Sequence, residues 1–198
     1  MLSACRSTAM ALTAMVVAFV GCRKDPGLEQ PGTSIFIPSL PSWLQDSAGY
    51  RWITPADNPS TNEGVALGRR LFYEKALSND FSMSCATCHR QEDAFSDRRT
   101  FSVGTNGTLG RRQAMAIVNL AWDGSFFWDG RSSSLEAQAF KPVVDHAEMR
   151  NAWPTVVSRL QADPTYPRQF ERAFGTSLID SVNVVRAIAQ FERSLISL

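Results

Sequence analysis

Apolar side chains along most of the chain recur at helical spacing. Leu67 and Leu71 lie four residues apart, while Arg69 and Arg70 fall on the opposite side, as in an amphipathic helix. The segment 179–198 shows the same spacing, at Val184, Val185, Ile188, Phe191 and Leu195. No segment shows a convincing alternation of apolar and polar residues, and no internal repeat is visible. The pattern therefore predicts an all-α fold with long loops.

Capping residues and turn-rich stretches suggest where the helices begin. Ser60 and Glu63 have the spacing of a capping box, and another helix should begin near Ser133 or Ser134. The loops between helices include a Gly-rich basic stretch at 96–112 and an aromatic, turn-rich stretch at 122–131. Further helices are expected at 113–120, 155–162, 166–174 and 179–198.

The first 21 residues are typical of an export signal. Arg6 precedes an uncharged apolar run at 7–20 that is short for a membrane span. The stretch Phe19-Val-Gly-Cys22 then resembles a bacterial lipoprotein cleavage site, although Phe19 stands where leucine is usual. We expect residues 1–21 to be removed and Cys22 to carry a lipid that anchors a periplasmic protein to the membrane. A plain signal peptide cut nearby is the alternative.

Composition divides the remainder into a linker and one domain. Residues 22–57 are rich in Pro, Gly and Ser and show no sustained period, which is typical of a tether. Residues 58–198 are expected to form a single domain. With 20 basic and 19 acidic side chains, the chain gives no reason to expect a nucleic-acid partner.

The motif Cys85-Ala-Thr-Cys88-His89 carries the chemistry. C-x-x-C-H is typical of covalent c-type haem attachment, because two thiols one helical turn apart can each form a thioether. His89 would then bind the iron through Nε2, while its other ring nitrogen donates to a carbonyl or carboxylate. The alternatives are a disulfide, a thioredoxin-like redox pair or half of a zinc site. No second Cys/His pair and no βαβ pattern supports the last two.

The sixth position of a haem iron decides between an electron relay and an enzyme. Electron-transfer cytochromes commonly fill that position with Met or His, whereas a peroxidase keeps it open or opens it on activation. The chain offers few candidates, namely His146, Met115 and Met149.

Three stretches together resemble a known family. The stretches are LGRRLFYEKALSNDFSMSCATCHRQEDAFSD at 67–97, FFWDGRSSSLEAQAFKPV at 126–143 and AEM at 147–149. They resemble the N-terminal half of bacterial di-haem cytochrome c peroxidases, whose superfamily includes the methylamine-utilisation di-haem oxidases. The resemblance runs from about Asn58 to the end. It implies a cytochrome-c-like helical domain wrapped around one covalent haem c.

The resemblance also implies an activity and roles for individual residues. The activity is reduction of hydrogen peroxide to water with electrons from a small cytochrome c or cupredoxin, and dimers are common in the family. Cys85 and Cys88 match the attachment cysteines and His89 the iron ligand. The remaining roles fall to Glu148 as the distal acid/base carboxylate, Gln138 as a distal-pocket amide and Trp128 as the tryptophan between two haems. The simpler readings are an exposed helix-end acid for Glu148, a surface residue for Gln138 and core packing for Trp128.

The chain departs from the family pattern in two places. Many members carry a histidine in the Gly-rich loop that caps the resting iron, but here Thr105 stands in that place, in SVGTNG. We therefore expect a resting iron that is high-spin and open to peroxide, with His146 as the only replacement cap. The second departure is that the chain has no second C-x-x-C-H. It is expected to be a fragment of a longer product without the second haem domain, or else a mono-haem protein.

Three questions stay open at this point. A family calcium site is doubtful, since its side-chain amide position falls near Gln113 and its other half is missing. A pure electron-transfer cytochrome with Met149 or His146 as sixth ligand is the alternative function. A haem domain that senses redox state or oxidises another protein would share the same site.

Overall fold

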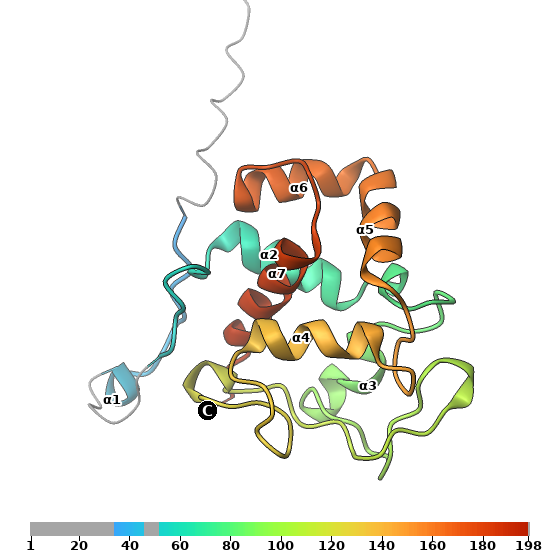
Figure 1. Cartoon of the computed structure of the whole chain (residues 1–198). Helices are drawn as coiled ribbons and strands as arrows, with labels where there is room; N and C mark the ends of the chain where they lie inside the picture. Colours follow the sequence, from blue (N-terminus) through green and yellow to red (C-terminus); the bar gives the residue numbers. More distant parts are fainter. Residues whose placement is uncertain (1–33, 46–51, 198) are drawn as a thin grey trace, which may run out of the picture.

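In the computed structural model, residues 34–45 and 52–197 are described, and this part of the chain is helical (Figure 1). Strand pairing within these residues is limited to isolated bridges, such as the one between Ile35 and Thr61. The all-α prediction is therefore confirmed. The described α-helices are α1 (Ser42–Gln45), α2 (Asn62–Phe72), α3 (Cys85–Cys88), α4 (Leu135–Val144), α5 (Trp153–Ala162), α6 (Thr165–Phe174) and α7 (Ser181–Ser194). Short 3-10 turns lie at Lys75–Leu77, Gln91–Asp93, Thr105–Gly107 and Leu120–Trp122.

Helix α7 lies at the centre, packed between α2 and α4 (Figure 1). The close approach of α2 to α7 depends on glycine: a Cβ at Gly68 would overlap the backbone carbonyl of Ala187. Side chains on the facing surfaces, including Leu67, Leu71 and Ile188, are buried. The periodic apolar positions of the sequence therefore form the core that carries the site.

The starts of α2 and α4 depend on side-chain caps. Thr61, rather than Ser60, caps α2, since its side chain accepts from the Gly64 N–H at 3.0 Å. The prediction for this start was thus wrong by one residue. Ser134 caps α4 and accepts from the Ala137 N–H at 3.1 Å, which confirms the second predicted start.

The C-terminal helix is shorter than predicted. It begins after Asp180, whose side chain accepts from the Asn183 N–H at 2.7 Å. It ends at Ser194, and the carbonyl of the next residue, Leu195, accepts from the Asn119 N–H at 2.8 Å. The end of the described chain therefore pairs with a loop instead of continuing the helix.

The helix predicted at 113–120 is wrong. The backbone of this stretch pairs with distant partners: the Ile117 N–H donates to the Phe95 carbonyl at 3.1 Å, and the Gln113 carbonyl accepts from Trp128 Nε1 at 2.9 Å. Backbone groups that are used in this way cannot also form the i to i−4 ladder of a helix. The stretch instead runs along the cavity described below, and only Leu120–Trp122 forms a short turn.

Part of the predicted tether lies against the domain. The Phe36 N–H donates to the Ser60 carbonyl at 2.9 Å, and the Ile53 N–H donates to the Ala121 carbonyl at 2.7 Å. The predicted leader and Cys22 lie outside the described residues. Among the helices that are described, none is long and apolar enough to cross a membrane.

Candidate functional site

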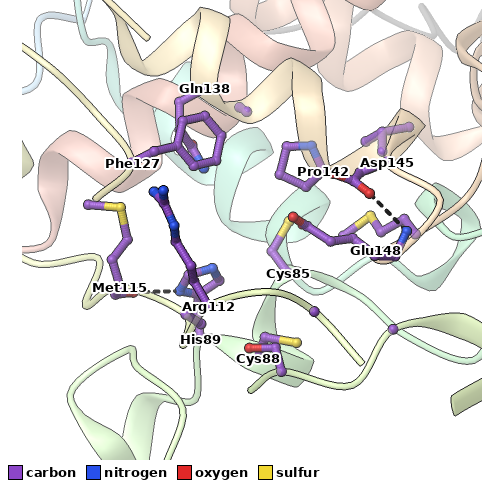
Figure 2. A pocket seen from close by; sticks show the side chains of 18 of the residues that line it. Cys85, Cys88, His89, Arg112, Met115, Phe127, Gln138, Pro142, Asp145 and Glu148 are labelled. Atoms are coloured by element: carbon purple, nitrogen blue, oxygen red, sulfur yellow. Dashed lines mark hydrogen bonds between the residues drawn. The ribbon is translucent and has the colours of Figure 1, made fainter. Parts of the chain in front are cut away.

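A cavity of about 770 Å³ opens between α3, the loops around 102–115 and 127–131, the turn after α4, and α7 (Figure 2). The residues of the C-x-x-C-H motif lie on one side of this cavity. Gln138, Phe127 and Pro142 lie on the other side. The fold thus brings the motif at 85–89 and the later stretch at 126–149 into one site.

His89 is oriented by two backbone carbonyls. Its Nδ1 lies 3.0 Å from the Met115 carbonyl oxygen and 3.3 Å from that of Phe95. Both partners are acceptors, so Nδ1 carries the proton and Nε2 keeps its lone pair. Burial lowers the pKa of His89, although the two carbonyl contacts oppose that shift. A neutral imidazole with a free Nε2 fits an iron ligand.

The two cysteines occupy the single turn of α3. Both thiols are free, so the structure gives no support to a disulfide between them. Burial raises the pKa of both Cys85 and Cys88, which keeps them as thiols. The described residues contain no cluster of three or more His, Cys, Asp or Glu side chains that could hold a metal ion. Free thiols beside a large cavity, with His89 next to them, fit thioether attachment of a haem.

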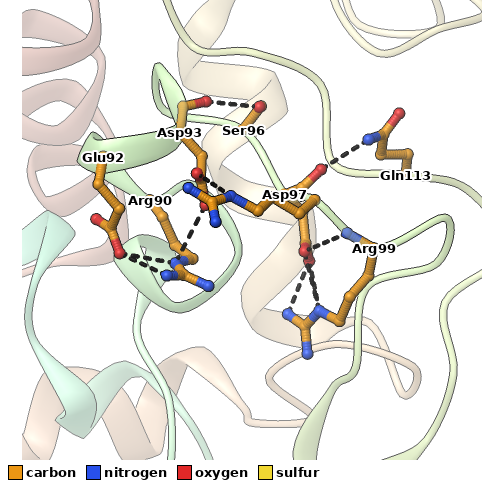
Figure 3. Close-up of polar contacts among 8 residues, drawn as sticks. Arg90, Glu92, Asp93, Ser96, Asp97, Arg99 and Gln113 are labelled. Carbon is orange, nitrogen blue, oxygen red and sulfur yellow. Dashed lines mark hydrogen bonds and ion pairs between the residues drawn. The ribbon is translucent and has the colours of Figure 1, made fainter.

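The loop that follows His89 is fixed by polar contacts (Figure 3). Asp97 is 2% exposed and binds the Arg99 guanidinium at 2.7 Å, and this partner lowers the pKa of Asp97. The Asp97 carbonyl accepts from Gln113 Nε2 at 2.6 Å. The amide that the family pattern would assign to calcium is therefore used to tie together two loops beside the cavity.

Gln138 projects from α4 into the cavity. It is 8% exposed, and it shares the buried face of the helix with Leu135 and Ala139. Reading Gln138 as a surface residue is therefore wrong. Pro142, one turn further along α4, also lines the cavity, and its ring cannot donate to the Gln138 carbonyl.

Glu148 lies in the turn after α4 and lines the cavity. Its side chain is half-buried, and burial raises its pKa to about 7. The negative charge of Asp145 adds to this rise, while Arg131 opposes it. An exposed helix-end acid would not show these features. At neutral pH, Glu148 can both take up and release a proton.

Trp128 lies at the rim of the cavity and not in the core. It is 64% exposed, and its Nε1 donates to the Gln113 carbonyl at 2.9 Å. Reading Trp128 as core packing is therefore wrong. The neighbouring Asp129 forms ion pairs with Arg131 at 2.8 Å and with Arg112 at 2.9 Å, and these contacts stabilise the turn.

The candidates for the sixth position, and Thr105 at the place of the capping histidine, differ in their surroundings. Met115 is half-buried and lines the cavity. Thr105 is 2% exposed, and both its N–H and its Oγ1 donate to the Glu148 carbonyl, at 2.9 and 3.2 Å. His146 is exposed at the edge of the cavity, while Met149 is buried and lines it.

Arg112 and Glu192 are among the cavity residues that were not found from the sequence. Arg112 extends into the cavity beside Met115 (Figure 2), although it looked like part of a basic loop. Glu192 lines the cavity from α7 and is 3% exposed. A signal for Glu192 existed, since it follows the buried Ile188 by four residues and so shares its helix face.

Comparison with known proteins assigns the chain to a family. Residues 62–198 match the family model of di-haem cytochrome c peroxidases. Methylamine utilization protein MauG of Methylorubrum extorquens is 44% identical over 144 residues, which cover 72% of this chain and 41% of that protein. Cytochrome c peroxidase Ccp of Escherichia coli is 33% identical over 144 residues, which cover 72% of this chain and 31% of that protein.

Solved structures show the same relationship. The structure of a MauG-like protein associated with microbial copper homeostasis aligns with a TM-score of 0.71 and 36% identity, over 79% of this chain and 47% of that one. This likeness confirms the cytochrome-c-like helical fold. The chain spans less than half the length of the relatives it matches.

Proposed function

Because the chain belongs to the di-haem cytochrome c peroxidase family, we propose that it forms a peroxidatic haem c domain. The reaction is reduction of hydrogen peroxide by two electrons and two protons to two molecules of water. Cys85 and Cys88 would hold the haem and His89 would bind its iron. The observation that carries the proposal is the half-buried carboxyl group of Glu148 in the cavity that His89 also lines, where burial raises its pKa to about 7.

The residues of this chain would orient peroxide and move protons. The haem supplies the redox chemistry when bound. The contact of His89 with the Met115 carbonyl holds the ring so that Nε2 is available. Gln138 can orient peroxide with its amide N–H groups. Glu148 can take a proton from one peroxide oxygen and return it to the other, since its pKa lies near neutral pH.

Trp128 is proposed as the entry point for electrons. Its large ring is 64% exposed at the cavity rim, so it can contact a partner protein on one side and the site on the other. The donor would be a small cytochrome c or cupredoxin.

We further propose that the resting iron is high-spin and open. Thr105 stands at the loop position where many family members carry a capping histidine. Its hydroxyl donates to the Glu148 carbonyl at 3.2 Å, so it is engaged with protein. The runner-up function is an electron relay in which Met149 or His146 fills the sixth position, and an optical spectrum separates the two.

A second candidate function is oxidation of a partner protein. The exposure of Trp128 favours it. A ring at the surface can take electrons from a protein that is oxidised as a substrate, just as it can take them from an electron donor. Among the relatives, the protein that is 44% identical is named for methylamine utilization and not for peroxidase activity. Turnover with a reduced cytochrome, compared with oxidation of candidate proteins, distinguishes these functions.

We propose a periplasmic location, with the chain held at the membrane by a lipid on Cys22. Labelling with a radioactive fatty acid should be lost in Cys22→Ser. A second haem domain in the full gene product and a homodimer are proposed from the family pattern. Haem content and mass of the purified native protein test both.

The direct test of the enzyme is Glu148→Gln in the haem-loaded protein. We expect peroxide turnover with a reduced cytochrome to fall by about 10²- to 10⁴-fold, the usual range for loss of an acid/base group. Glu171→Gln, an exposed carboxylate on α6, is the matched control and should leave turnover unchanged. Full turnover in Glu148→Gln would rule out the proposed role.

A further inference from the structure

The Gly-rich loop docks onto the backbone of the candidate acid. Thr105 is 2% exposed, and both its N–H and its hydroxyl donate to the Glu148 carbonyl oxygen. The preceding residue must be glycine for reasons of space, because a Cβ at Gly104 would overlap the Ala147 carbonyl oxygen. Gly104 and Thr105 thus form a corner that fits tightly against residues 147 and 148.

The loop is shaped for this contact by its own hydrogen bonds. The Gly104 N–H donates to the Thr108 carbonyl at 2.8 Å, and the Gly110 N–H donates to the Ser102 carbonyl at 2.8 Å. Asn106, at the tip, adopts a left-handed conformation with φ of 59°, which asparagine tolerates better than most residues. The corner is therefore preformed and need not be ordered by a ligand.

The receiving turn is held from its other side. The Glu148 N–H donates to the Asp145 carbonyl at 3.1 Å, and the Met149 N–H donates to the Pro142 carbonyl at 3.1 Å. The Met149 carbonyl accepts from the Asn79 N–H at 2.9 Å. These three bonds leave the Glu148 carbonyl free to accept from the Gly-rich loop. The hydrogen bonds from Thr105 to this carbonyl therefore hold the loop against the turn.

We propose that the corner formed by Gly104 and Thr105 is a latch that holds the Glu148 carboxyl in its half-buried position in the cavity. This inference rests on the proposed function of Glu148. Thr105 is then a positioning residue, because it acts on peroxide only through Glu148. If the loop moved away, water would reach the Glu148 carboxyl and stabilise its charged form.

Burial and the nearby charges together set the pKa of Glu148, and burial gives the direction in which opening the latch should change it. Asp145 raises its pKa and Arg131 lowers it, while burial is the largest cause of the rise to about 7. Arg112 and Glu192 also line the cavity, from the loop and from α7. The latch adds no charge of its own, so opening it removes burial and should lower the pKa of Glu148.

The test is an infrared titration of protonated carboxyl groups in the haem-loaded protein, with the Glu148 band assigned by its loss in Glu148→Gln. Thr105→Val removes the hydroxyl and keeps the shape, whereas Thr105→Ser keeps the hydroxyl. Gly104→Ala pushes the loop away from the turn. Thr108→Val, at an exposed position in the same loop, is the matched control.

We expect Thr105→Ser and Thr108→Val to titrate at the same pH as wild type. Thr105→Val and Gly104→Ala should titrate at least one pH unit lower, a tenfold change in proton affinity. Titration of both variants at the wild-type pH would overturn the latch. Full peroxide turnover in Glu148→Gln would refute the proposed function, while the titration would still decide the latch, because it uses no peroxide.

Discussion

His89 Nδ1 lies 3.0 Å from the carbonyl oxygen of Met115, 26 residues further along the chain. This contact fixes the tautomer of the ring and leaves Nε2 free for a metal. It also explains why residues 113–117 are not helical, since the Met115 carbonyl is used by the imidazole instead of by a helix. One hydrogen bond thus links the haem motif to the loop that lines the cavity.

Removing both thiols should abolish covalent haem attachment. We expect Cys85→Ala/Cys88→Ala to contain no haem after denaturation, because no thioether can form, whereas Cys85→Ala alone should keep haem through one bond. Haem staining of a denaturing gel and intact mass measure this. Haem that stays with the double variant after denaturation would refute attachment at this motif.

Glu192 should make stability depend on pH. It is 3% exposed, and burial raises its pKa to about 8, with Glu136 adding to the rise and Arg193 opposing it. Because the folded pKa lies above the unfolded value, this contribution is fully present below about pH 4.5 and is lost as pH rises through about 8.

The variant Glu192→Gln isolates that contribution. Between pH 5 and pH 9 the wild-type free energy of unfolding should fall by roughly a few kcal/mol more than that of Glu192→Gln, at about 1.4 kcal/mol per unit of pKa shift. Denaturant unfolding of the haem-loaded protein measures the difference, with Glu171→Gln as control. Parallel pH profiles for the two proteins would show that Glu192 is not protonated in the folded state.

The contact of α2 with α7 should be sensitive to one methyl group. Gly68→Ala places a Cβ against the Ala187 carbonyl, so the helices must separate. We expect a loss of about 1–3 kcal/mol in the free energy of unfolding. Gly124→Ala, where nothing lies within 4 Å, should change it by less than about 0.5 kcal/mol. Equal midpoints of denaturant unfolding for the two variants would contradict the packing described.

Trp128→Phe should affect electron delivery more than stability. The side chain is 64% exposed, so the free energy of unfolding should change by less than about 0.5 kcal/mol. Reduction of the ferric protein by a small reduced cytochrome, followed by stopped-flow absorbance, should slow at least tenfold. Trp43→Phe, equally exposed on α1, is the control and should reduce at the wild-type rate. Unchanged reduction in Trp128→Phe would place electron entry elsewhere.

Local patterns predicted the elements whose stability is local. The cap at Ser134, the periodic face of α7 and the C-x-x-C-H turn all depend on residues within a few positions of one another. The helix predicted at 113–120 was wrong because the backbone of this segment pairs with Phe95, His89 and Trp128. These residues come near the segment only in the folded protein.

In the candidate site, too, residues in a local motif could be predicted from the sequence, whereas features that depend on distant contacts could not. Cys85, Cys88 and His89 could be identified from their spacing, but the assignment of Gln138 and Glu148 needed the family resemblance. The exposure of Trp128 and the docking of Thr105 on Glu148 arise from loop packing, for which the sequence carries no periodic signal.

The most direct test of an open peroxidatic site is the optical spectrum of the ferric protein before and after one equivalent of hydrogen peroxide. We predict a high-spin resting spectrum that changes rapidly on mixing in wild type and slowly in Glu148→Gln. A low-spin spectrum that peroxide leaves unchanged would mean that the sixth position is filled, and would contradict the account.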